Sequence, residues 1–207
     1  MLFAILCSTQ PNYKLNKHEN VNTMNFNNTA QTYGFVIKFL HWAMAIAIFA
    51  LFGLGVWMRT LTYYSPWYKP APHWHQSIGI LLLVLLVFRL AWRLSNVRPN
   101  EDYLKPFERF AARAMHITFY LILFIIMISG YFITSVDGSS VDVFNWFSIP
   151  SIYEKKGAEE LAGFIHWTLA YAVMALAGLH TLAALKHHFL DHDITLKRML
   201  PERWLKP

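Results

Sequence analysis

The chain has 207 residues, of which 56% are hydrophobic and 14% are charged, whereas soluble domains carry about 25% charged residues. Sixteen phenylalanines, ten tyrosines and eight tryptophans exclude an intrinsically disordered chain. The single cysteine, Cys7, excludes a disulfide framework, a zinc site built from thiolates and a covalent CxxCH attachment site. A net charge of +6 is compatible with nucleic acid or with an anionic membrane surface as a partner.

Four apolar stretches of 21 to 26 residues dominate the sequence. A helix needs about 20 residues to cross the hydrocarbon core of a bilayer. Charged residues lie only near the ends of these stretches, and buried helices of soluble proteins are rarely so apolar on all sides. We therefore predict an all-α integral membrane protein, a four-helix bundle. The predicted spans are Val36–Met58, Trp74–Leu94, Phe110–Thr134 and Leu161–Lys186.

The segment before the first span, residues 1–32, is predicted to be a flexible tail. Residues 1–7 are apolar but too short to cross a membrane, and they lack the basic start of a signal peptide. The asparagine-rich stretch that follows favours disorder, and we expect translation to start at Met24. The four-span domain is predicted to cover residues 33–190, and residues 191–207 are predicted to form a second, cytoplasmic tail.

Lysine and arginine gather on one side of the four predicted spans. Fourteen of the 18 lie in the N-terminal segment, around the loop between the second and third spans, and in the C-terminal tail. The other side carries Arg59, Lys69, Lys155 and Lys156. Because cytoplasmic loops carry an excess of these residues, both termini are predicted to be cytoplasmic. This distribution accounts for the basic charge without nucleic acid, for which no binding motif is present.

Histidines are the main ionisable residues inside the predicted spans. His41 lies near the cytoplasmic side of the first span, and His75 lies near the outer side of the second. In the fourth span, His166 and His180 are 14 residues apart, which corresponds to about 21 Å of helix and places both side chains within about 40° of one face. Ionisable groups within a bilayer are costly and mostly functional. The four residues therefore predict two sites at two membrane depths.

Pairs of histidines that face each other across a helical bundle can supply the axial ligands of haem iron. The predicted pairs are His41 with His180 at the inner level and His75 with His166 at the outer level. Each histidine taken singly can also be a polar contact between helices. Glycines close to three of these histidines would let a flat macrocycle approach the backbone; they are Gly79, Gly163 and Gly178.

Zinc is the alternative metal. Structural zinc takes about four ligands around one ion, and about 21 Å of helix between His166 and His180 excludes a shared ion for those two residues. An exposed metal between His73 and His75 remains open. A haem-free membrane protein, which uses its histidines for packing or for metal transport, is a further alternative.

The histidines lie in short motifs between about Tyr33 and Pro201. The motifs are FLHW at 39–42, HQSIGILLL at 75–83, VFRLAWR at 87–93, MHITFYL at 115–121, IHWTL at 165–169, GLHTLAALKHHF at 178–189 and DITLKRMLP at 193–201. In this order they resemble the bacterial cytochrome b561 family of inner-membrane dihaem cytochromes. The last two motifs are the most specific part of the resemblance.

The resemblance implies a bundle that binds two haem b groups, with His41, His75, His166 and His180 as the axial ligands. It also implies electron transfer across the bacterial inner membrane from a periplasmic donor to ubiquinone. In a superoxide oxidase-like member the donor is superoxide, which would make the chain a superoxide:ubiquinone oxidoreductase. The alternative is a cytochrome b subunit that anchors a larger dehydrogenase or hydrogenase complex.

Two further histidines lie where the resemblance implies a quinone pocket. His116 opens the third span and His187 follows the fourth. Their predicted role is to hydrogen-bond the quinone carbonyls and to deliver protons, because histidine exchanges a proton near neutral pH. The alternative is an interfacial histidine that faces lipid headgroups. Arg89 and Arg93 are candidates for pairing with haem propionates at the inner level.

The outer loops carry five acidic residues against four basic ones. This balance does not favour an anionic substrate over the whole outer surface. Lys155 and Lys156 could form a local positive patch, and Glu159 and Glu160 could instead dock a basic electron carrier. The sequence leaves both alternatives open.

Overall fold

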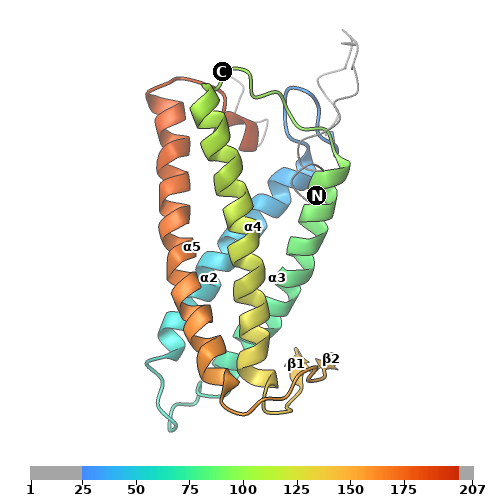
Figure 1. The fold of residues 1–207 in the computed structure, drawn as a ribbon, viewed down its shortest axis with the longest axis vertical. Helices are drawn as coiled ribbons and strands as arrows, with labels where there is room; N and C mark the ends of the chain where they lie inside the picture. The colour runs from blue at the N-terminus through green and yellow to red at the C-terminus, as the bar shows by residue number, and fades with distance from the viewer. Residues whose placement is uncertain (1–24, 201–207) are drawn as a thin grey trace.

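The computed structural model describes residues 25–200, and four long helices run side by side within it (Figure 1). The helices are α2 (Phe35–Met58), α3 (Pro70–Ser95), α4 (Pro106–Ser135) and α5 (Ala158–Phe189). Two short antiparallel strands, β1 (Val141–Val143) and β2 (Phe147–Ile149), form a hairpin between α4 and α5. A 3-10 helix, η1 (Lys197–Met199), follows α5.

The bundle has two different ends. The segments 25–34, 96–105 and 190–200 lie at one end, the terminal end, which is at the top of Figure 1. The α2–α3 loop and the β1–β2 hairpin lie at the other, the hairpin end. Because each helix runs the length of the bundle, neighbours in sequence are antiparallel and a residue's position along its helix gives its depth.

Each of the four helices is long and apolar enough to cross a membrane. Large apolar side chains are exposed along the outside of the bundle, including Ile46 (68% exposed), Val84 (61%) and Leu182 (64%). In water such a continuous apolar surface promotes aggregation, whereas lipid tails solvate it. The predicted four-helix membrane bundle is confirmed, and the orientation of its termini remains a prediction.

The helices extend beyond the predicted apolar spans. Helix α3 begins at Pro70 and α4 at Pro106, and proline suits the first turn because the amide hydrogen that it lacks has no partner there. The amide of Lys105 donates to a carboxylate oxygen of Glu108 at 3.2 Å, which caps the start of α4. Hydropathy marks where lipid contact ends, and the backbone hydrogen bonds continue through the polar residues beyond it.

The core lies at the middle of the bundle. Met44 of α2, Leu82 and Leu86 of α3, Leu123 of α4 and Val173 of α5 are buried against one another. We call these five residues the apolar belt. It occupies the depth between His41 and His75 along the bundle and halfway between His166 and His180 on α5.

The segments at the terminal end are tied together by hydrogen bonds. The Asn28 side chain donates to the carbonyl of Val97 at 2.9 Å, and the Asn100 amide donates to the carbonyl of Ala30 at 2.8 Å. The buried Arg198 donates to the carbonyl of Asn100 at 2.6 Å. The described parts of both predicted tails therefore contact the loop between α3 and α4. Residues 1–24, with the predicted start at Met24, and residues 201–207 lie outside the described range.

The hairpin end closes against α3. Val141 and Val143 are buried, and the hydroxyl of Ser77 accepts a hydrogen bond from the Phe144 amide at 3.0 Å. Phe144 and Asn145 form the turn with positive φ angles of 48° and 58°, the conformation that tight hairpin turns use. The hairpin is thus fixed to α3 two residues beyond His75. The sequence analysis treated this segment as a loop.

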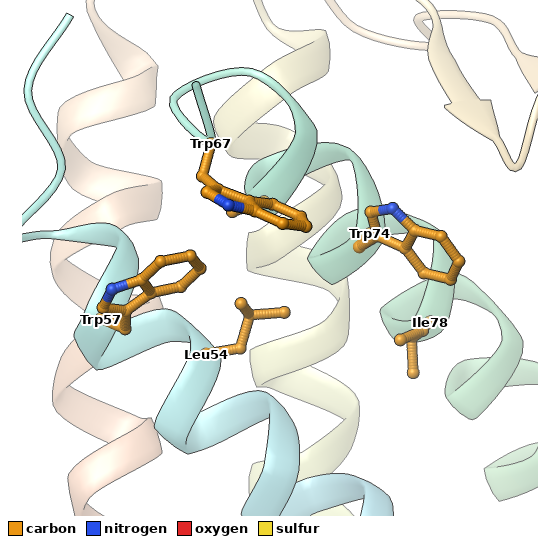
Figure 2. A pocket seen from close by; sticks show the side chains of 6 residues that line it. Leu54, Trp57, Trp67, Trp74 and Ile78 are labelled. Atoms are coloured by element: carbon orange, nitrogen blue, oxygen red, sulfur yellow. The ribbon is translucent and has the colours of Figure 1, made fainter. Parts of the chain in front are cut away.

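Three tryptophans lie together near the hairpin end. Figure 2 shows Trp57, Trp67 and Trp74 around an apolar hollow of about 330 Å³ between α2 and the start of α3. The rings of Trp57 and Trp67 have centroids 6.0 Å apart. Because indole rings collect at the boundary between lipid and water, this group indicates where the membrane ends.

Candidate functional site

His75 of α3 and His166 of α5 face each other near the hairpin end, and we call them the hairpin-level pair. Their ring centroids are 6.0 Å apart and their planes cross at 67°. The Nδ1 of His166 lies 2.8 Å from the carbonyl oxygen of Ile126 on α4 and donates to it. The Nε2 of His166 therefore keeps a free lone pair. The Nδ1 of His75 is buried without a hydrogen-bond partner among residues 25–200, which is uncommon unless a group binds nearby.

A cavity of about 530 Å³ adjoins the hairpin-level pair and is lined by both rings. Its volume is in the range of sites for small molecules and cofactors. Apolar side chains from all four helices form most of the wall, and four glycines contribute to it. They are Gly55, Gly79, Gly130 and Gly163.

Two of these glycines contact the histidine rings across the bundle. A Cβ atom on Gly130 of α4 would lie 2.9 Å from Cε1 of His166, and one on Gly55 of α2 would lie 3.3 Å from Cε1 of His75. A larger residue at Gly130 would displace the ring. The sequence analysis found Gly79 and Gly163 because each lies close to a histidine in sequence, and it missed Gly55 and Gly130 because they face the rings from other helices.

Three histidines meet near the terminal end, and we call them the terminal-level cluster. The rings of His41 on α2 and His180 on α5 have centroids 6.3 Å apart with planes at 66°. His116 of α4 is also a neighbour of His180, with centroids 5.9 Å apart and planes at 63°. His180 therefore has two histidine partners, while His166 has one.

Two arginines of α3 lie beside this cluster. A terminal nitrogen of Arg89 lies 3.2 Å from Nδ1 of His41. Because guanidinium only donates, this contact leaves the ring proton on Nε2, so binding of iron through Nε2 requires Arg89 to turn away. The Nε of Arg89 and the hydroxyl of Tyr120 are buried with no hydrogen-bond partner in the described part of the chain. The guanidinium of Arg93 lies 5.7 Å from the centroid of the Tyr120 ring. These donors fit an anionic group such as a carboxylate.

The separation of the rings tests whether a metal ion fits between them. An imidazole nitrogen binds a metal ion at about 2.0–2.1 Å, so two rings on opposite sides of one ion have centroids roughly 6 Å apart. The pairs His75–His166 and His41–His180 both meet this condition. The donor sets fit haem iron, which histidine ligates. The structure thus brings the four histidines together in the two predicted pairs, and their role as ligands remains a prediction.

The exposed metal site considered between His73 and His75 is not supported. The ring of His75 faces His166 and lines the cavity inside the bundle. A ligand set that includes it would have to form within the cavity, away from the outer surface.

His187 lies in a network of charged side chains at the terminal end. Its Nδ1 is 2.7 Å from a carboxylate oxygen of Asp193 and 3.0 Å from one of Asp191. The Lys186 ammonium bridges Asp191 at 2.7 Å and Glu108 at 2.8 Å. Its hydrogen bond holds the pKa of the Asp191 carboxyl below its usual range. The end of α5 is thus a connected network of charged side chains.

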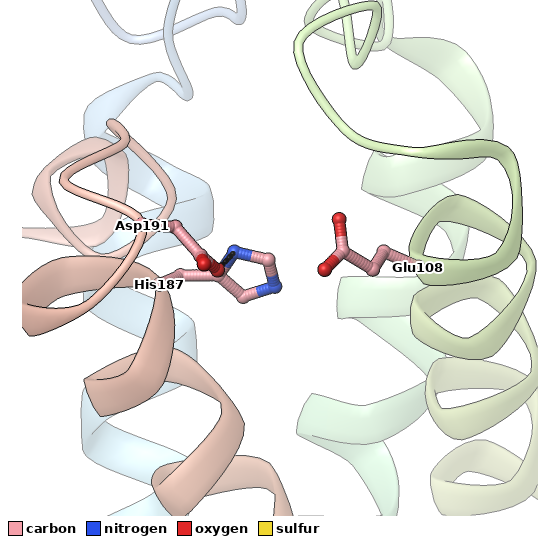
Figure 3. Close-up of side chains that lie close together, drawn as sticks. All are labelled: Glu108, His187 and Asp191. Carbon is pink, nitrogen blue, oxygen red and sulfur yellow. Dashed lines mark ion pairs between the residues drawn. The ribbon is translucent and has the colours of Figure 1, made fainter.

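Glu108, His187 and Asp191 also offer atoms that could hold a metal ion, all within 4.8 Å of one another (Figure 3). The ammonium of Lys186 already forms an ion pair with each of the two carboxylates of this group. A cation would have to displace it. The described ion pairs therefore already use both carboxylates that a metal ion would need.

Known proteins resemble this chain over most of its length. Residues 32–202 match the family model described as prokaryotic cytochrome b561. The chain is 47% identical to cytochrome b561 homolog 2 of Escherichia coli over 179 residues, which is 86% of this chain and 95% of that relative. It is 32% identical to the probable superoxide oxidase CybB of Yersinia pestis over 146 residues, which is 68% of this chain and 78% of that relative.

Proposed function

Because the chain belongs to the prokaryotic cytochrome b561 family, we propose that it carries electrons across the bacterial inner membrane from a donor at one face to ubiquinone at the other. Members of this family are membrane b-type cytochromes that bind haem b, and this chain is a multi-pass membrane protein. The proposal includes the direction of electron transfer, the identity of the donor, the quinone and the number of haems.

The proposal assigns one haem b to His75 and His166 and a second to His41 and His180. Ring separations of 6.0 Å and 6.3 Å support both assignments. The spacing of 14 positions from His166 to His180 sets the two levels about 21 Å apart along α5. Haem iron would supply reversible one-electron transfer at each level. The protein would hold the two groups at fixed depths with the apolar belt between them.

The orientation proposed has the terminal end in the cytoplasm. Within residues 25–200, ten of the 14 lysines and arginines lie at that end or in the helix ends next to it, which is the distribution of cytoplasmic segments. The hairpin-level pair would then lie near the periplasm and would receive electrons first. Superoxide is the donor that we propose, by analogy with the relative named a probable superoxide oxidase.

The proposed overall reaction balances with two electrons and two protons. Two superoxide anions lose one electron each and leave as two molecules of dioxygen. One ubiquinone takes up the two electrons and two protons from the cytoplasm and leaves as ubiquinol. Because the electrons arrive singly and the protons come from the opposite side to the donor, the quinone site must accept protons at the terminal end.

His116 and His187 are the residues that we propose for this quinone site. His116 is a neighbour of His180, with ring centroids 5.9 Å apart, so a quinone hydrogen-bonded to His116 would lie close to the second haem. The side chain of His187 is 12% exposed and is held by Asp193. This carboxylate orients the ring. The assigned role of His187 is proton delivery.

The observation that carries the proposal is the pair of matched histidine contacts at two depths in a membrane bundle. The test uses purified, detergent-solubilised protein from cells with sufficient haem. We expect a reduced-minus-oxidised spectrum of b type and a pyridine haemochrome assay that gives two haems per chain. Stopped-flow mixing with superoxide and a soluble ubiquinone should then show reduction of the haems followed by reduction of the quinone.

Different results would exclude different parts of the proposal. Absence of a b-type spectrum would contradict the haem assignment. The other outcome is a haem-containing protein that superoxide does not reduce. If it also purifies with a large partner protein and takes electrons from that partner, the alternative of an anchoring subunit in a larger complex is favoured.

A further inference from the structure

One charged side chain lines the cavity beside the hairpin-level pair. Arg59 follows the last residue of α2 at the hairpin end and contributes to the cavity wall. Among the described residues that form this wall it is the only lysine, arginine, aspartate or glutamate. The polar groups of Gln76 and Thr134, which also line the cavity, are hydrogen-bonded to each other at 2.6 Å.

The exposed side chain of Arg59 contacts an aromatic ring next to a proposed ligand. Its guanidinium carbon lies 5.5 Å from the centroid of the Trp167 ring, a cation–π contact. Trp167 directly follows His166 and also lines the cavity. Within residues 25–200, Arg59 forms no ion pair with a carboxylate. Its donors are therefore available to an anionic group in the cavity.

We propose that Arg59 binds a carboxylate of the haem that His75 and His166 would hold. The inference rests on the proposed function, since it needs a haem at this level. Haem carries two carboxylate side chains, and a carboxylate placed among apolar side chains is costly unless a cation pairs with it. Guanidinium matches a carboxylate with two parallel hydrogen bonds. Arg59 would thereby select one orientation of the haem and slow its release.

A small anion from the aqueous phase would bind Arg59 through the same chemistry. The two sources differ in what they predict. If Arg59 binds a haem carboxylate, replacing it changes haem retention and the reduction potential even when no substrate is present. If Arg59 binds only diffusing anions, replacing it changes only the rate at which an anionic reductant reduces the haem.

The test compares Arg59→Gln and Arg59→Lys with a matched control, Lys69→Gln. Lys69 is a basic residue at the same end, next to the start of α3, and is not part of the cavity wall. The readout is the rate at which oxidised full-length protein in detergent gives up haem to excess apomyoglobin, with a redox titration of the haem at this level.

We expect Arg59→Gln to lose this haem about tenfold faster, since that is the effect of one charge-assisted hydrogen bond. Its reduction potential should fall, because an unpaired carboxylate stabilises the oxidised iron. Arg59→Lys should restore most of the retention, and Lys69→Gln should behave as the wild type. The haem at the other level serves as an internal reference within each variant.

Four results would overturn the inference. Unchanged retention in Arg59→Gln, together with slower reduction by the dithionite anion, would assign Arg59 to diffusing anions. Equal changes in Arg59→Gln and Lys69→Gln would indicate a general effect of surface charge. A wild-type protein without haem at this level would overturn the proposed function as well, whereas a loaded wild type with an unaffected Arg59→Gln variant would overturn only the role of Arg59.

Discussion

The two histidine levels hold their rings at almost the same separation but in different surroundings. At the hairpin level, two histidines meet beside an apolar cavity with one cation in its wall, Arg59. At the terminal level, three histidines meet beside two arginines that have no carboxylate partner within residues 25–200. In the proposed function, this difference in surroundings separates electron entry at the hairpin level from proton-coupled exit at the terminal level.

The largest expected effect is the loss of the haem at one histidine level without loss of the other. His166 has one histidine partner, so His166→Ala should abolish the haem at the hairpin level and leave the other, halving the haem content per chain. The pyridine haemochrome assay measures this. His73→Ala, at the same end but outside the cavity wall, is the matched control and should keep both haems. Loss of both haems in His166→Ala would mean that the levels do not bind independently.

The second prediction concerns the extra histidine of the terminal-level cluster. His180 is common to both contacts, so His180→Ala should remove the haem at that level. In His41→Ala the His116–His180 pair remains, with centroids 5.9 Å apart. This variant should therefore retain a measurable fraction of that haem with an altered spectrum. Low-temperature spectra and electron paramagnetic resonance of the two variants distinguish them. Equal, complete loss in both would assign His116 to the quinone alone.

The third prediction uses two glycines in different surroundings. A methyl group at Gly130 would meet His166 at 2.9 Å, whereas one at Gly178 would meet nothing within 4 Å. Gly130→Ala should destabilise the protein by about 1–3 kcal/mol and weaken haem binding at the hairpin level. Gly178→Ala should be neutral or stabilise α5 by up to about 1 kcal/mol. Thermal unfolding in detergent and haem content measure both effects, and equal behaviour of the two would contradict the close contact.

The smallest expected effect lies in the charged network of the terminal end. The hydrogen bond from Lys186 lowers the pKa of Asp191 below its ordinary value of 3.8. A carboxylate with a depressed folded-state pKa contributes stability above its unfolded pKa and loses it as the pH falls through the folded value. The unfolding temperature should therefore fall on acidification below about pH 4, and it should fall less in Asp191→Asn. A steeper fall in the variant would contradict the assigned pair.

The four spans and the depths of the paired histidines could be predicted, because a span and a residue's depth depend only on the sequence of one helix. Apolar length gives the spans, and the spacing of His166 and His180 gives two depths on one face. The rotation of each helix about its axis is not encoded locally, so Gly55, Gly130 and the position of His116 beside His180 could not be predicted. The β1–β2 hairpin was missed because its signal is a short strand pair between two strong apolar spans.

The apolar belt has an energetic consequence for the proposed reaction. Its five side chains, Met44, Leu82, Leu86, Leu123 and Val173, are packed against one another and offer no polar group to water or protons at mid-membrane. Electrons would cross this layer alone, so each turnover would separate charge across the bilayer. With a cytoplasm that is electrically negative, every inward electron works against about 2.3 kcal/mol per 100 mV of membrane voltage. A large membrane voltage would therefore slow electron transfer through this protein, and depolarisation would speed it up.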